Sequence, residues 1–301
     1  MSQINPRQAC PCGSGKRYKA CHGDPRGTQD VMVPRPFAGL AAECQLVALR
    51  EFVSSATAPL PLAQPASRNV TLATVLPTAA AAVVRPDGAA LVGLQVLARS
   101  GDLSRDLGRA LSWALSAPPG SVLPVVATTA EGEQIRLQDL LDAQAPLHVS
   151  VHSDFAWWVP GEEVPSGEVA AALQQANAAI MPTEAVTGVG VEAAYWVDAG
   201  AKAHLRWVRP EPEEQLLTAL ARLAAQDELN LGEGSRFAGS FRAHGVLVPV
   251  WDLDSERHAR EWAAPAEAFA HRLTQALTPA PLTTPQRRAL QALHARQLTL
   301  R

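Results

Sequence analysis

The sequence predicts an α+β fold in which a mainly antiparallel sheet is combined with helices. Two observations lead to this prediction. Short apolar segments with strand character alternate with longer segments in which apolar residues return at helical spacing. Several strand pairs are also separated only by tight turns, at 85–88, 198–200 and 242–245. Connections this short join antiparallel neighbours, so they favour α+β over a doubly wound parallel sheet.

The elements follow from these patterns in chain order. The predicted strands are 70–76, 80–84, 91–97, 122–128, 147–151, 193–197, 203–208, 236–242 and 246–253. The predicted helices are 40–54, 104–116, 138–142, 168–181, 213–226, 255–277 and 285–297.

Composition shifts divide the chain into four parts. We expect a compact N-terminal segment at 1–27 and a Pro-rich tether with one helix at 28–68. An α+β body at 69–278 and a basic helical tail at 279–301 follow. The body has a faint internal repeat, since 82–97 and 239–253 share an Arg-x-x-Gly turn followed by an apolar strand. Two related halves, near 69–181 and 185–278, would explain this repeat; chance similarity in an Ala-, Val- and Leu-rich chain is the alternative.

Composition and charge exclude several classes of protein. The 301 residues are 47% hydrophobic and 18% charged, which is typical of a globular chain and not of a disordered one. The longest uncharged run, between Arg109 and Glu131, is broken by Pro118-Pro119-Gly120, and the polar first residues lack a signal-peptide core. We therefore expect a cytoplasmic protein without a membrane span.

The net charge of −3 is unevenly distributed. Residues 1–27 and 279–301 each carry a net charge of +4, which leaves −11 for the residues between them. An acidic body repels nucleic acid, so nucleic acid could be bound only through the basic ends.

Three of the four cysteines lie within twelve residues at the N-terminus. Cys10 and Cys12 are one residue apart, and Cys21 is followed directly by His22. Three thiolates and one imidazole are a donor set that binds structural zinc with tetrahedral geometry and leaves no position open for water. The pattern therefore predicts a zinc knuckle that maintains the fold of this segment and is not catalytic. The fourth, Cys44, lies in an apolar helical pattern and is interpreted as a buried small residue.

The residues between these ligands are basic and aromatic. Lys16, Arg17 and Lys19 surround Tyr18, and two of the chain's three lysines are among them. These four residues predict a small contact surface for a partner.

The segment Cys10–Gly23 resembles the SEC-C motif, the zinc knuckle best known from the C-terminus of the SecA translocation ATPase. It contains the Cys-x-Cys pair, Gly-Ser-Gly-Lys, an aromatic residue and the Cys-His end. The resemblance implies that Cys10, Cys12, Cys21 and His22 bind zinc and that the module docks, as in the ATPase, to a protein partner or the ribosome. It covers about 14 residues, so a translocase function does not follow. The whole chain resembles an uncharacterised family of high-GC bacteria with this knuckle before an α+β body.

A second hypothesis comes from a different part of the chain. His148, His152 and Asp154 alternate along the predicted strand at 147–151 and beyond it, so they would share one face. Two imidazoles and a carboxylate could bind a catalytic metal, as in a metal-dependent hydrolase, with Phe155 to Trp158 as a pocket wall. The alternative is a half-solvated strand with an ordinary polar face, and a non-enzymatic body remains the first hypothesis.

Two further segments carry polar patterns. Asp252, Asp254, Glu256 and His258 resemble a ligand set, but Asp254 or Ser255 before a helical pattern is better interpreted as an N-cap. The basic tail from Gln286 to Arg301 has leucines on one stripe, so it is expected either to pack on the body or to bind elsewhere.

Overall fold

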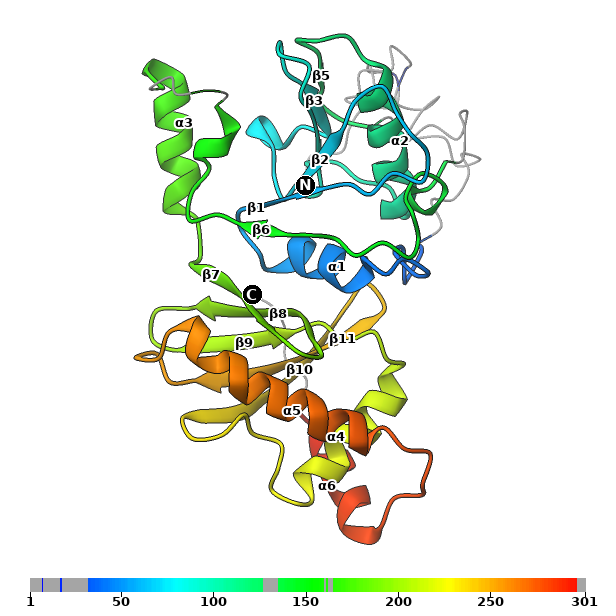
Figure 1. The fold of residues 1–301 in the computed structure, drawn as a ribbon, viewed down its shortest axis with the longest axis vertical. Coiled ribbons are helices and arrows are strands. Elements are labelled where there is room, and N and C mark those ends of the chain that lie inside the picture. Colours follow the sequence, from blue (N-terminus) through cyan, green and yellow to red (C-terminus); the bar gives the residue numbers. More distant parts are fainter. Residues whose placement is uncertain are drawn as a thin grey trace. The chain divides into compact units, whose positions relative to one another are not determined.

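The computed structural model describes Arg7, Arg17, residues 32–126, residues 135–159, Gly161 and residues 165–296. The chain divides into two compact units, and each is described here by itself. Unit 1 comprises Met1–Pro36 and Leu60–Asp142; unit 2 comprises Phe37–Pro59 and Ala143–Arg301. Helices and strands occur in both units, which confirms the α+β class (Figure 1).

Unit 1 contains a mixed array of four short strands. Their order is β5 (Val122–Leu123), β3 (Ala82–Val84), β4 (Ala90–Gly93) and β2 (Val70–Ala73). Strand β3 is antiparallel to β4 and β5, as the tight turn at 85–88 predicted. Strands β2 and β4 are parallel, so the sheet is not wholly antiparallel. The chain passes from β2 to β3 through a 3-10 turn, η2 (Pro77–Ala79).

Helix α2 (Leu103–Ser116) forms the helical layer of unit 1. It begins where the Asp102 carboxylate accepts hydrogen bonds from the amides of Ser104 and Arg105, which satisfies donors at the helix start. Its apolar stripe, including Leu107 and Leu111, is buried. At Gly108 an added Cβ would lie 2.6 Å from the carbonyl oxygen of Ile135, so glycine allows the segment before η3 (Leu137–Asp139) to pack against the helix.

Unit 2 contains a five-stranded sheet in which every neighbouring pair is antiparallel. The order is β10 (Ser235–Ala243), β11 (Val246–Leu253), β9 (Ala203–Trp207), β8 (Val191–Asp198) and β7 (Thr183–Gly188). The turn His244-Gly245 joins β10 to β11 with positive φ at both residues, the geometry of a two-residue hairpin. A further antiparallel pair joins β1 (Ala56–Pro59) to β6 (Ser150–Val151), and η4 (Ala156–Trp158) and α3 (Gly167–Ala178) follow it.

An aromatic core and two helices cover one face of this sheet, and a third helix packs against one of the two. The helices are α4 (Glu213–Ala224), α5 (Ala263–Ala276), which η5 (Ala259–Trp262) precedes, and α6 (Thr284–His294). The side chains of Trp207, Trp251 and Phe269 are almost completely buried and contact one another, with ring centroids 5.0–6.4 Å apart. These rings fill the layer between the sheet and α5.

The opposite face of the sheet packs against α1 (Glu43–Glu51). The buried Tyr195 on β8 donates a hydrogen bond of 2.5 Å to Gln45 Oε1. The ring of Phe52, just after α1, meets Tyr195 and Phe241 edge-on. Because both of its faces are buried, β8 is apolar along most of its length.

Several predicted boundaries were wrong. The helix predicted at 255–277 begins at Ala259, because Asp254 Oδ1 accepts from the Glu256 amide in a turn that precedes the helix. The helix predicted at 138–142 is only the short η3, and β1 and β7 were not predicted.

The predicted C-terminal helix packs on the body of unit 2. Leu293 on α6 is 4% exposed and belongs to the core under the sheet. The guanidinium of Arg222 on α4 donates to the carbonyl oxygens of Ala276 and Ala280, which holds the connection between α5 and α6 against α4. Of the two alternatives for the tail, packing on the body therefore holds for α6.

We predict that Phe269→Ala destabilises unit 2 by about 3–5 kcal/mol, because it empties the space beneath two tryptophans. Urea unfolding followed by tryptophan fluorescence measures the loss. Val189→Ala is the control, since Val189 is 84% exposed and its truncation should cost less than about 0.5 kcal/mol. Equal losses for the two variants would contradict this description of the core.

Candidate functional site

The predicted zinc ligands and most of the predicted contact surface lie outside the described residues. This holds for Cys10, Cys12, Cys21 and His22, and for Lys16, Tyr18 and Lys19; Arg17 is described and is exposed. Within the described ranges, no group of three or more His, Cys, Asp or Glu side chains could hold a metal ion. The zinc knuckle therefore stays a prediction. Cys44, which was expected to be buried, is partly exposed on α1.

The alternative site is built on β6 and the residues after it, all within unit 2. His148 is exposed, whereas His152 is partly buried and its Nε2 lies 2.8 Å from Thr57 Oγ1. The ring of His152 also lies 5.9 Å from that of Trp157. The imidazole of His152 is thus paired with a hydroxyl of the neighbouring strand β1.

Asp154 is engaged in local structure. Its Oδ1 accepts from the Ala156 amide at 2.9 Å, where η4 begins. Its carbonyl oxygen accepts from Ser55 Oγ at 2.7 Å, and Ser55 Oγ in turn accepts from Trp157 Nε1. These bonds connect the segment after β6 to the residue before β1. A metal-dependent hydrolase at His148, His152 and Asp154 stays a prediction, and the described residues around it add no further metal ligand.

The acidic pattern at 252–258 is distributed over separate contacts. Asp252 lies on β11 and meets residues of β9 and β10, while His258 Nε2 lies 3.0 Å from Glu184 Oε1 on β7. Asp254 heads the turn before η5. These residues therefore do not form one ligand set.

Asp252 is the centre of a charged cluster that the sequence analysis did not find. Its Oδ2 accepts from Lys202 Nζ at 3.0 Å and from Arg236 at 2.8 Å. Its Oδ1 lies 3.2 Å from Nδ1 of His204. Three strands or their turns supply these groups, so the cluster depends on register across the sheet. The sequence offers one signal for the face on which the cluster lies. In β9, His204 stands between the apolar Ala203 and Leu205, so its side chain points to the face opposite theirs.

The environment shifts the pKa values of the acidic and imidazole groups in this cluster. Burial by itself would raise the pKa of Asp252, but hydrogen bonds from Arg236 and Lys202 bring it below its ordinary value. Burial lowers the pKa of His204, and the positive charges of Arg206 and Lys202 add to this, against the opposing charge of Asp252. The arrangement thus favours an ionised Asp252 and a neutral His204.

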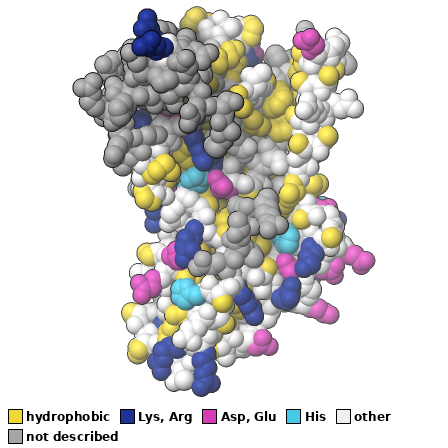
Figure 2. Space-filling view, turned by 180° about the vertical axis from the view of Figure 1, so that it is seen from behind, with side chains coloured by type: hydrophobic (Ala, Val, Ile, Leu, Met, Phe, Trp, Pro, Cys, Tyr) yellow, Lys and Arg dark blue, Asp and Glu magenta, His cyan; other side chains and the backbone are white. Residues whose placement is uncertain are grey.

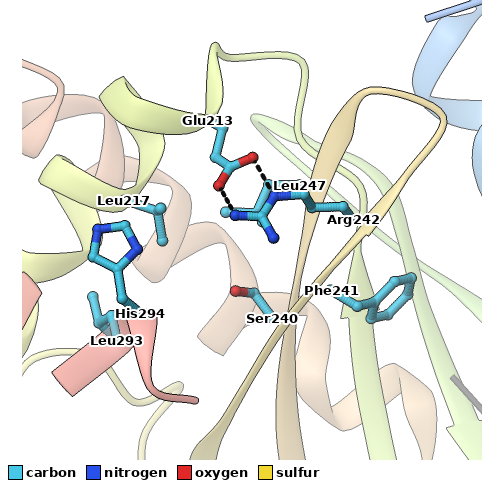
Figure 3. A pocket seen from close by; sticks show the side chains of 8 residues that line it. All are labelled: Glu213, Leu217, Ser240, Phe241, Arg242, Leu247, Leu293 and His294. Carbon is cyan, nitrogen blue, oxygen red and sulfur yellow. Dashed lines mark hydrogen bonds and ion pairs between the residues drawn. The ribbon is translucent and has the colours of Figure 1, made fainter. Parts of the chain in front are cut away.

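A second polar group lines a small cavity between α4, α6 and β10 (Figure 3). Glu213 and Arg242 form a two-bonded ion pair across it, and Ser240, Leu293 and His294 complete its walls. Hydrogen bonds from Arg242 lower the pKa of Glu213. The cavity holds about 30 Å³, which is room for about one water molecule, so the ion pair here joins α4 to β10 and leaves no space for a substrate.

Two protein-family models match this chain, one at the N-terminus and one over the remainder. A model described as the SEC-C motif matches residues 7–24. A model described as a family of unknown function, DUF5926, matches residues 36–301. The chain belongs to the DUF5926 family. The suspected combination of a SEC-C motif with an uncharacterised body family is therefore confirmed.

Two further findings complete the comparison. Neither the curated proteins nor the solved structures include a significant match to this DUF5926 chain. Within the part of the chain that is described, no helix has the length and apolar character needed to cross a bilayer.

We predict that His204→Gln makes the stability of unit 2 less dependent on pH between about 7.5 and 5.5. The pKa of His204 is lowered in the folded protein, so the unfolded chain takes up its proton first and stability falls as the pH drops below the ordinary value of 6.5. Removing the imidazole removes that contribution. Urea unfolding at both pH values measures the difference.

His148→Gln is the matched control, because His148 is an exposed histidine of the same unit. It should leave the dependence on pH as in the unmodified protein. An identical dependence in the His204 and His148 variants would contradict the proposed role of burial at His204.

Proposed function

We propose that this protein is a cytoplasmic docking protein. In this proposal its N-terminal SEC-C motif binds one structural zinc ion and contacts a protein partner or the ribosome. The observation that supports it is the match of the SEC-C motif to residues 7–24, which include Cys10, Cys12, Cys21 and His22.

The donor set suits zinc. Thiolate sulfur and imidazole nitrogen are the ligands of closed tetrahedral sites, and such a site supplies structure and no catalysis. A segment of 18 residues is too short to bury a core of its own, so its folding would depend on metal binding. Gly13 and Gly15 allow the tight turns that a loop between ligands needs.

Charge supports the docking role. Three thiolates and one Zn²⁺ carry a net charge of −1, so residues 1–27 would retain about +3 after metal binding. Lys16, Arg17 and Lys19 beside Tyr18 would then offer ammonium and guanidinium groups around one aromatic ring. An anionic surface of a protein or of a ribosome is the complementary partner.

We predict about one zinc per chain in reduced, purified protein, and its loss in Cys10→Ser/Cys12→Ser. Elemental analysis after gel filtration measures the metal content. Cys44→Ser is the matched control, because Cys44 lies on α1 outside the motif, and it should retain the zinc. Full zinc occupancy in the double Cys variant would refute the site.

The same measurement tests the alternative function. His148→Ala/His152→Ala should leave the zinc content unchanged if the knuckle is the metal site. A second equivalent of metal that disappears with this histidine pair would favour the hydrolase hypothesis.

We predict that Lys16→Glu/Lys19→Glu keeps its zinc but loses ribosome binding in a cosedimentation assay at low ionic strength, because repulsion replaces attraction. Binding of the unmodified protein should weaken as salt is raised toward about 0.5 M. Arg260→Glu is the control, since it reverses an exposed charge on η5. Equal binding by the knuckle variant and the control would exclude the ribosome as the partner of the knuckle.

A further inference from the structure

Unit 2 carries a groove on the side of the molecule formed by α6 and the edge strand β10. Its volume is about 440 Å³, within the range typical of ligand sites. One wall is formed by Ala289 and Ala292 of α6 and by Arg296 just after it, and the other by the loop after α4 together with the first residues of β10.

The floor of the groove is apolar and fixed. Phe237 and Leu293 are 7% and 4% exposed, and both belong to the core under the sheet. Leu229 packs against the same core. The hydrogen bond from Trp251 Nε1 to the Leu229 carbonyl oxygen, 2.8 Å long, holds the loop in place. The floor is therefore preformed.

The groove runs along one edge of the sheet. Strand β10 is the last strand of its sheet, with β11 as its neighbour on the inner side. The Asp254 amide donates to the Gly234 carbonyl oxygen, so these two residues form a hydrogen-bonded pair. Hydrogen-bonded and non-hydrogen-bonded pairs alternate along an antiparallel ladder, and Phe237 is three residues further on. The main-chain N–H and C=O groups of Phe237 therefore point away from β11. Beyond the bulge at Ala238, the Ser240 amide also points outward and donates to the Arg296 carbonyl oxygen at 3.2 Å. One peptide unit of the chain thus already pairs with this edge.

The rim of the groove is more basic than the body around it. Arg236 and Arg296 lie on opposite walls, against the single acid Asp227. The Arg236 side chain is 75% exposed although it contacts Asp252. On the face of the molecule shown in Figure 2, Lys and Arg side chains lie interspersed with Asp and Glu side chains. Because residues 28–278 carry a net charge of −11, two arginines at one groove form a local basic site on an acidic body, and such a site favours an acidic ligand.

We propose that this groove binds an extended acidic peptide segment of a partner protein, which adds to the outer edge of β10. Apolar side chains of the peptide occupy the floor over Phe237 and Leu293, and its carboxylates meet Arg236 and Arg296. Main-chain pairing at Phe237 supplies affinity, and the two arginines supply the preference for acidic sequence. This site is separate from the zinc knuckle.

A peptide-display selection tests the proposal. Random 12-residue peptides are selected on the full chain and, in parallel, on Ala292→Trp, whose indole would fill the groove from an exposed position of α6. We expect peptides selected only by the unmodified chain to be acidic with interspersed apolar residues. Identical selections on the two proteins, or basic peptides that depend on the groove, would overturn the proposal.

The selected peptide is then measured by fluorescence anisotropy and amide hydrogen exchange. Arg236→Glu and Arg296→Glu should each weaken binding about tenfold, and the matched charge reversal Arg260→Glu should not. Bound peptide should slow exchange of the Phe237 amide. Equal effects of all three reversals, or an unchanged Phe237 amide, would overturn the proposal.

The knuckle variant Cys10→Ser/Cys12→Ser separates this site from the proposed function. It should bind the peptide as tightly as the unmodified chain, whatever its zinc content. Loss of peptide binding in this variant would place the site at the knuckle and refute the groove.

Discussion

The burial of aromatic rings between the sheet and α5 is the interaction on which the rest of unit 2 depends. Trp207, Trp251 and Phe269 come from two strands and one helix, and all are almost fully buried. Since side chains alternate along a strand, burying Trp207 and Trp251 on one face places His204 and Asp252 on the other. The charged cluster around Asp252 follows from this register.

Charge distribution gives the molecule two different kinds of surface. The acidic body carries its excess carboxylates over most of its length, and basic residues concentrate toward the ends. The proposed knuckle and the proposed groove site beside α6 would both contact their partners through basic groups, yet the two sites differ physically. The knuckle would gain its shape from a metal ion, whereas the groove is formed by a packed core and a sheet edge.

Local sequence predicted much of the fold. The turns at 85–88 and 242–245 carry glycine where the chain needs positive φ, and both join antiparallel strands. Strand β7 was missed because its Thr-Glu-Ala-Val-Thr-Gly sequence is largely exposed at the sheet edge and lacks an apolar stripe. The helix before Leu277 was predicted too early, since Asp254 and Glu256 suit a turn as well as a helix start. The site at His148, His152 and Asp154 on one predicted strand stays a prediction; the sequence could not show that His152 pairs with Thr57, because that residue lies on a strand 95 residues away.

The sequence by itself determined the SEC-C motif, because its three cysteines and one histidine lie within thirteen consecutive positions and need no tertiary structure to be recognised. It also determined the hairpins, which depend on neighbouring residues. Only the tertiary structure decided that α6 packs on α4, that Asp252 gathers Lys202, His204 and Arg236, and that a basic groove borders β10. These features join residues from separate strands and helices, and strand register and helix packing bring them together.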